Sequence, residues 1–74
     1  MNYKYNQISD TDWALTVIRS EQETVCFNMS TDPERGFAQH VQMIQDFYDT
    51  AKLEYFVSLL LEDPSSAFAI YNNL

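Results

Sequence analysis

Residues 13–29, WALTVIRSEQETVCFNM, contain the pattern on which the fold depends. Alternate positions of an extended chain share one face: Trp13, Leu15 and Val17 do so in the first half of this stretch, and Val25, Phe27 and Met29 in the second. The polar residues 19–23 separate the two halves and suit a hairpin loop. The stretch therefore predicts two antiparallel strands with a common apolar face.

The chain before this hairpin contains a weaker strand candidate. Residues 3–8, YKYNQI, are rich in tyrosine, and the turn-like residues 9–12, SDTD, separate them from the hairpin. With this strand included, the N-terminal part is a three-stranded antiparallel meander.

The chain after the hairpin contains one short motif twice, DPERGFA from Asp32 and DPSSAFA from Asp63. Asp is a favoured helix N-cap, and proline fits the first helical position because its missing N–H is not needed there. Both motifs therefore predict helix starts. Phe37 and Phe68 then fall one turn into each helix, where we expect the core-facing side to begin.

Apolar residues recur at helical spacing after Asp32 and predict an amphipathic helix. The expected apolar stripe consists of Phe37, Val41, Ile44, Phe47 or Tyr48, and Ala51. The expected polar face consists of Arg35, Gln39, Gln42, Asp46 and Asp49.

Beyond Thr50 the apolar pattern changes phase. The second stripe consists of Leu53, Phe56, Val57, Leu60 and Leu61, and it lies on nearly the opposite side of a continuous helix. We therefore expect a break near residues 49–52 and a second helix that turns back. One long helix buried on two sides and a strand over residues 53–61 are the alternatives. Residues 67–71 predict a short third helix or an edge strand.

Together these elements predict an α+β fold in a single domain, residues 1–74. A small antiparallel meander of two to three strands forms the N-terminal part, and two or three helices pack on one of its faces.

The composition favours a folded chain outside the membrane. Of the 74 residues, 46% are hydrophobic and 15% aromatic, which is unlike a disordered sequence. Cys26 is the single cysteine, so no intrachain disulfide forms. The first residues lack the layout of a signal peptide, and no apolar run approaches the ~20 residues that span a bilayer. We expect a cytoplasmic protein.

Net charge narrows the class of partner. Eleven acidic and four basic residues give a formal charge of −7, which disfavours direct binding to nucleic acid or anionic lipid. The same charge favours encounter with a basic protein surface. The alternative is that the charge serves solubility only.

Residues suited to catalysis or metal binding are few. One nucleophilic arrangement can be considered: the thiol of Cys26 activated by His40, with Asp46 orienting the imidazole. The simpler interpretation is that Cys26 is a small packing residue in the middle of a strand. Asp10 and Asp12 lack the glycine and glutamate of a calcium loop, and one histidine with one cysteine cannot complete a zinc site. Gly36, the sole glycine, indicates close packing. We expect neither an enzyme nor a cofactor.

Tyrosines and acidic residues are the better candidates for a binding site. Five tyrosines cannot all be buried with satisfied hydroxyl groups in so small a core, and tyrosine is frequent among binding hot spots. The predicted contact residues are Asp46, Asp49, Glu54, Tyr48 and Tyr55, with Glu21 and Glu23 as more distant members. The alternative is an ordinary solvated helix face.

These features predict a small, acidic, non-catalytic protein-binding module. We expect a stoichiometric inhibitor that occupies a basic surface of a partner protein. A nucleic-acid-binding protein is one candidate for this partner. In size, charge and lack of catalytic residues the chain resembles phage-encoded inhibitors, including anti-CRISPR proteins, and the immunity proteins that neutralise toxins. The alternative is a self-associating structural or accessory subunit of a larger complex, a homodimer in which the second stripe, Leu53, Phe56, Val57, Leu60 and Leu61, packs against its symmetry mate.

Overall fold

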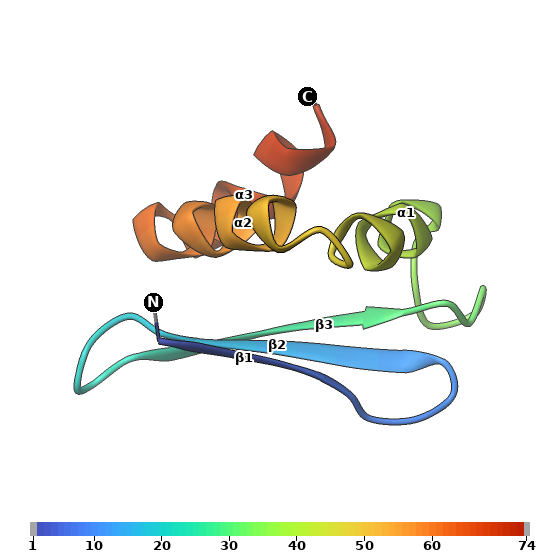
Figure 1. The fold of residues 1–74 in the computed structure, drawn as a ribbon, viewed down its shortest axis with the longest axis horizontal. Coiled ribbons are helices and arrows are strands. Elements are labelled where there is room, and N and C mark those ends of the chain that lie inside the picture. The colour runs from blue at the N-terminus through green and yellow to red at the C-terminus, as the bar shows by residue number, and fades with distance from the viewer. Residues whose placement is uncertain (1, 74) are drawn as a thin grey trace.

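The computed structural model describes residues 2–73 and confirms the α+β class (Figure 1). Three strands come first and three helices follow: β1 (Tyr3–Gln7), β2 (Asp12–Ile18), β3 (Thr24–Ser30), α1 (Ala38–Asp46), α2 (Thr50–Glu62) and α3 (Pro64–Asn72). The helices lie over one face of the sheet, and no described element covers the other face.

The sheet is an antiparallel meander in the order β1-β2-β3. Leu15 lies opposite Tyr5 on one side and Phe27 on the other, so the alternating apolar residues of all three strands share one face. That face meets the helices, as predicted, and the weaker strand candidate is confirmed as β1.

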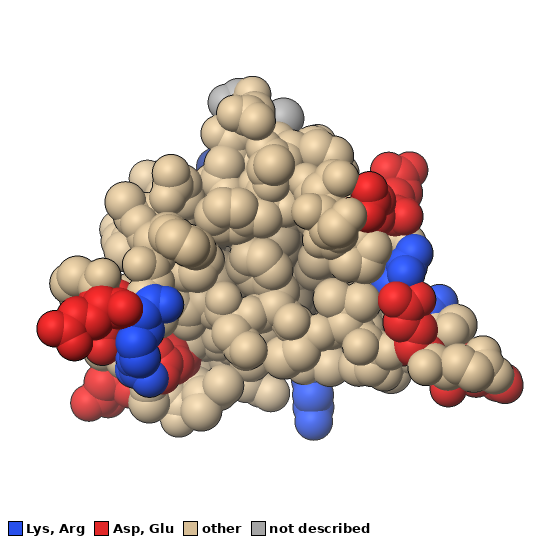
Figure 2. Space-filling view, turned by 180° about the vertical axis from the view of Figure 1, so that it is seen from behind, with Lys and Arg blue, Asp and Glu red and all other residues tan. Residues whose placement is uncertain are grey.

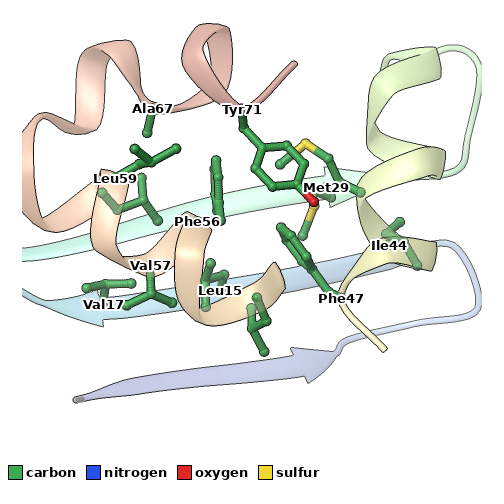
Figure 3. Close-up of a cluster of buried hydrophobic side chains, with 13 residues drawn as sticks. Leu15, Val17, Met29, Ile44, Phe47, Phe56, Val57, Leu59, Ala67 and Tyr71 are labelled. Carbon is green, nitrogen blue, oxygen red and sulfur yellow. The ribbon is translucent and has the colours of Figure 1, made fainter. Parts of the chain in front are cut away.

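The core forms between the sheet and the helices (Figure 3). Phe56 from α2 packs above Leu15 of β2, and Tyr71 from α3 lies beside Phe56, with their ring centroids 5.4 Å apart. Phe56 and Leu15 are fully buried. Aromatic side chains therefore supply much of the volume that a chain of this length needs for its core.

The predicted break between two helices is confirmed. α1 ends at Asp46, and α2 begins at Thr50 with Asp49 as its N-cap, whose carboxylate accepts a hydrogen bond from the Ala51 N–H at 3.0 Å. Because the chain turns here, Ile44 and Phe47 of the first stripe and all of the second stripe except Leu61 are buried in the same core. On a continuous helix the two stripes would lie on nearly opposite sides. The alternatives of one long helix and of a strand over residues 53–61 were wrong.

The helix start at Asp63 is also confirmed. Its carboxylate accepts from the Ser65 N–H at 3.2 Å, and Pro64 occupies the first helical position. The resulting helix, α3, is longer than the predicted residues 67–71, and Phe68 packs against the core.

The helix start at Asp32 was wrong. Asp32 instead begins a single turn, in which its carboxylate accepts from the Glu34 N–H at 2.9 Å and its carbonyl from the Gly36 N–H at 2.8 Å. Arg35 ties this turn to the end of the sheet through Asp12, at 3.0 Å. The chain then passes through an extended residue, Phe37, with φ −114° and ψ 158°, before α1 begins.

This shift also corrects the apolar stripe of α1. Phe37 is 63% exposed and Val41 39% exposed, although both were expected to face the core. The buried residues of this region are His40, Met43, Ile44 and Phe47. The helix is amphipathic, but its buried side is rotated because its first turn begins five residues later than expected.

Candidate functional site

A groove of about 500 Å³ lies where α1, the start of α2 and the end of α3 meet. Its lining is mixed, with carboxylate, ammonium, amide and aromatic groups: Gln42, Asp46, Ala51, Lys52, Tyr55, Tyr71 and Asn72. Two of the predicted contact residues, Asp46 and Tyr55, are among them. The sequence could not show that Tyr71 and Asn72 complete this groove, because they come from the other end of the chain.

Asp46 is a partly buried carboxylate held by its neighbours. It accepts from Gln42 Nε2 at 3.0 Å and from the Tyr71 hydroxyl at 2.9 Å. These hydrogen bonds, with the nearby Lys52 ammonium, hold the pKa of Asp46 below its ordinary value despite partial burial. Asp46 therefore stays ionised and oriented at neutral pH.

Lys52 is the only basic side chain that lines the groove among residues 2–73. Its Nζ lies 3.9 Å from Asp46 Oδ1, and the side chain is 56% exposed. Such an ion pair is weak, because solvent screens it and the long side chain stays mobile. The pair therefore holds Lys52 only weakly beside Asp46.

The tyrosines divide into two groups. Tyr71 is buried, and Tyr3 and Tyr5 are partly buried against the core. Tyr48 is 84% exposed and Tyr55 is 40% exposed, with its ring centroid 6.3 Å from that of Tyr71. The two tyrosines predicted as contact residues are thus the two most exposed.

The remaining acidic candidates near the groove come from the connection between α1 and α2 and from α2 itself. Asp49 and Glu54 are both exposed, and Tyr48 precedes Asp49 in the same connection. The structure therefore gathers five of the seven predicted contact residues around the start of α2.

Glu21 and Glu23 lie at the other end of α2. Glu23 pairs with Arg19 at 2.6 Å, and the guanidinium of Arg19 donates to the carbonyl of Leu61 at 3.1 and 3.0 Å. Because α2 has 13 residues, its two ends are about 20 Å apart. The hairpin acids are therefore separate from the groove.

The residues predicted for self-association do not form a surface. Leu53, Phe56, Val57 and Leu60 belong to the core of the chain itself, and Leu61 alone is exposed, at 36%. This correction follows from the turn before α2, which directs the stripe toward the sheet.

The nucleophilic arrangement considered for Cys26 is not assembled. Cys26 is exposed on the sheet face away from the helices, with its Sγ 3.5 Å from Asn28 Oδ1. His40 is buried on the helix side, where burial lowers its pKa and its Nδ1 accepts from the Ser30 N–H at 3.4 Å. The sheet thus separates the thiol from the imidazole.

Asp12, at the end of the first turn, forms a structural ion pair. Asp12 binds Arg35, and a hydrogen bond with Ser30 is the main cause of its lowered pKa. In the described part of the chain, no three histidine, cysteine or acidic side chains converge as metal ligands.

The fold and the groove define a small α+β protein with a depression on its helical layer, lined by polar and aromatic side chains and containing one carboxylate and one ammonium group. Comparison of the chain with protein-family models, with curated proteins and with solved structures finds no match. None of the helices between residues 2 and 73 has the length and apolar character needed to cross a membrane.

Proposed function

We propose that this protein is a small, acidic, non-catalytic binding module that acts as a stoichiometric inhibitor. It occupies a basic surface of a partner protein and so blocks that surface. The observation that supports this proposal is the groove at the start of α2, where an ionised carboxylate, Asp46, lies beside the rings of Tyr55 and Tyr71.

Such a groove suits the side chain of an arginine or lysine. A guanidinium can stack on the partly exposed ring of Tyr55 while it approaches the carboxylate of Asp46. Arginine is the better ligand because its planar group both stacks and forms paired hydrogen bonds. Lys52 holds the position weakly until the partner's cation replaces it.

The rest of the molecule assists this contact through its charge. A net charge of −7 steers the protein toward a basic surface. Asp49 and Glu54 are exposed, and they lie within two residues in sequence of the groove-lining Ala51 and Tyr55. Proteins that bind nucleic acids have such surfaces because they must neutralise phosphates. The partner we propose is a protein of this kind in the cytoplasm, and the inhibitor is of the phage anti-defence type, such as an anti-CRISPR, or of the toxin-immunity type.

The experiment uses the tagged protein as bait in lysate from its natural host, washed at low and then at high salt. The affinity for the retained protein is then measured by calorimetry. We expect Glu54→Lys to weaken binding by more than about 1 kcal/mol. Asp49 is left unchanged because its carboxylate caps α2. The matched control is Glu21→Lys, which changes the net charge equally at the other end of α2 and leaves the Arg19–Glu23 pair intact.

A third variant tests the groove itself. Lys52→Met removes the internal cation, so we expect tighter binding of the partner. Equal losses in the two charge-reversal variants, together with no gain from Lys52→Met, would remove the groove from the proposal and leave only long-range attraction.

A further inference from the structure

The outer edge of β3 is a free sheet edge, because β3 pairs only with β2 in the described sheet. Two hydrogen bonds define which residues face it: the Arg19 N–H donates to the carbonyl of Glu23, and the Thr31 N–H to that of Thr11, both at 2.9 Å. In an antiparallel pair the bonded positions alternate. The N–H and C=O groups of Thr24, Cys26, Asn28 and Ser30 therefore point away from β2.

One end of this edge is closed by the chain itself. The N–H of Ser30 donates to His40 Nδ1 at 3.4 Å. Gly36 packs against the carbonyl of Ser30 so closely that a Cβ on Gly36 would collide with it. The open part of the edge is therefore residues 24–28, TVCFN.

This open part is short, but it lacks the charges, prolines and bulges by which many proteins protect sheet edges from pairing. It contains no charged residue and no proline, and its register with β2 is uninterrupted. Seen from the side of β3, the charged residues gather mainly at the two ends of the molecule, with uncharged surface between them (Figure 2). Strand pairing at this edge thus places no like charges directly opposite each other.

The free backbone groups of the edge belong to Thr24, Cys26 and Asn28, so Cys26 lies at their centre. We propose that a second copy of this chain pairs its β3 with this edge, antiparallel, around a twofold axis at Cys26. Thr24 then lies opposite Asn28 of the second copy, and Cys26 opposite its own counterpart. In this register the free backbone groups of Thr24, Cys26 and Asn28 in each chain form hydrogen bonds with the other chain. The two three-stranded sheets then become one sheet of six strands.

The neighbouring register is blocked. An axis at Phe27 would place Thr24 opposite Ser30 of the second copy, where His40 and Gly36 already occupy the edge. With the axis at Cys26, the hairpin of one copy turns back toward its own β2 before it reaches His40 and Gly36 of the second copy. The closed end therefore excludes the register with its axis at Phe27, whereas the axis at Cys26 allows Thr24, Cys26 and Asn28 of both copies to form hydrogen bonds.

The helix side of the edge supports the same pairing. Phe27 stacks with Phe68 at a centroid distance of 5.8 Å, and Phe68 contacts the exposed ring of Phe37 at 6.0 Å. In the proposed register, Val25 of the second copy lies opposite Phe27, close to these rings. The groove at the start of α2 is a separate surface, so this inference does not depend on the proposed partner.

The test measures self-association under reducing conditions. We expect sedimentation equilibrium to show a dimer at about 100 μM. Cys26→Lys, which places two ammonium groups opposite each other, should weaken the dimer at least tenfold. The control is Thr16→Lys, because Thr16 is the neighbour of Cys26 on the outer face of the central strand β2. This variant should dimerise like the native chain.

A second measurement does not depend on variants. Cys26 is the single thiol, so a short bifunctional thiol reagent should link the two chains only if their Cys26 residues face each other. The amide protons of Thr24, Cys26 and Asn28 should also exchange more slowly as the protein concentration rises. A native chain that stays monomeric at this concentration, or a dimer that neither responds to Cys26→Lys nor cross-links, would overturn the proposal.

Discussion

The hydroxyl of Tyr71 in α3 donates a hydrogen bond of 2.9 Å to Oδ2 of Asp46 at the end of α1. The bond joins the last helix to the first, and both residues line the groove. It also directs the carboxylate, since Asp46 is fixed on its other side by Gln42. The carboxylate of Asp46, the acidic group that lines the candidate site, thus also helps to hold the helices together.

Removal of this bond tests how strongly it joins the helices. We expect Tyr71→Phe to lower the free energy of unfolding by about 1.5 kcal/mol, because a hydrogen bond to a charged acceptor in a partly buried site is lost. Urea denaturation measures the change. A cycle with Asp46→Asn isolates the pair, and a coupling energy near zero would show that the bond contributes nothing to stability.

His40 should make the stability of the protein depend on pH below about 6.5. Burial among Phe27, Phe37 and Phe68 lowers the pKa of His40 below 6.5, so the unfolded chain binds the proton more readily than the folded one. The contribution of neutral His40 to the free energy of unfolding is therefore complete above pH 6.5, and it decreases as the pH falls toward the pKa of His40 in the folded protein. Urea denaturation at pH 7.5 and 5.5 should show this loss.

The single histidine allows a direct check by NMR, because its ring resonances are unambiguous. His40→Gln, whose side-chain oxygen can still accept from the Ser30 N–H, should remove most of the pH dependence. A measured pKa at or above 6.5 would contradict the expected burial effect.

Tyr5 offers a stabilising substitution. Its hydroxyl is the one buried side-chain polar atom without a hydrogen-bond partner among residues 2–73, and burial, with a smaller effect of Tyr48, raises its pKa to about 12. A buried hydroxyl without a partner costs desolvation energy. We expect Tyr5→Phe to raise the free energy of unfolding by up to about 1 kcal/mol, whereas Tyr3→Phe should have no such effect. A loss of stability on Tyr5→Phe would mean that the hydroxyl has a partner in solution.

Gly36 should not tolerate a side chain. A Cβ would collide with the carbonyl of Ser30, which is backbone at the end of β3 and cannot move without disturbing the sheet. We expect Gly36→Ala to destabilise the protein by about 1–3 kcal/mol. Gln39→Ala, at an exposed position of α1, should change stability by less than about 0.5 kcal/mol. Thermal unfolding of both variants decides whether the contact at Gly36 is as tight as described.

Local patterns predicted much of the fold. The alternation in residues 13–29 was sufficient for β2 and β3, because a strand with one buried face needs this period and no other. Asp63 and Pro64 were sufficient for the start of α3, because the cap and the first helical position involve only adjacent residues. The change of apolar phase near Thr50 was sufficient for the break between α1 and α2.

The candidate site was only partly predictable. Asp46, Asp49 and Tyr55 could be selected because they are acidic or aromatic on an expected surface. The hydrogen bond by which Asp46 joins α1 to α3 could not be predicted, because its partner Tyr71 is 25 residues away in sequence. The separation of Glu21 from this group likewise depends on how the hairpin and α2 lie in space.

The sequence by itself determined which segments extend and which coil, because alternation, caps and prolines act between near neighbours. Tertiary structure alone decided between the two Asp-Pro motifs. Asp63 is exposed and starts a helix. Asp32 instead follows β3, and contacts of Arg35 and Gly36 hold its turn against the end of the sheet. The motif at Asp32 therefore closes as a single turn, and α1 begins only after Phe37 has redirected the chain across the sheet.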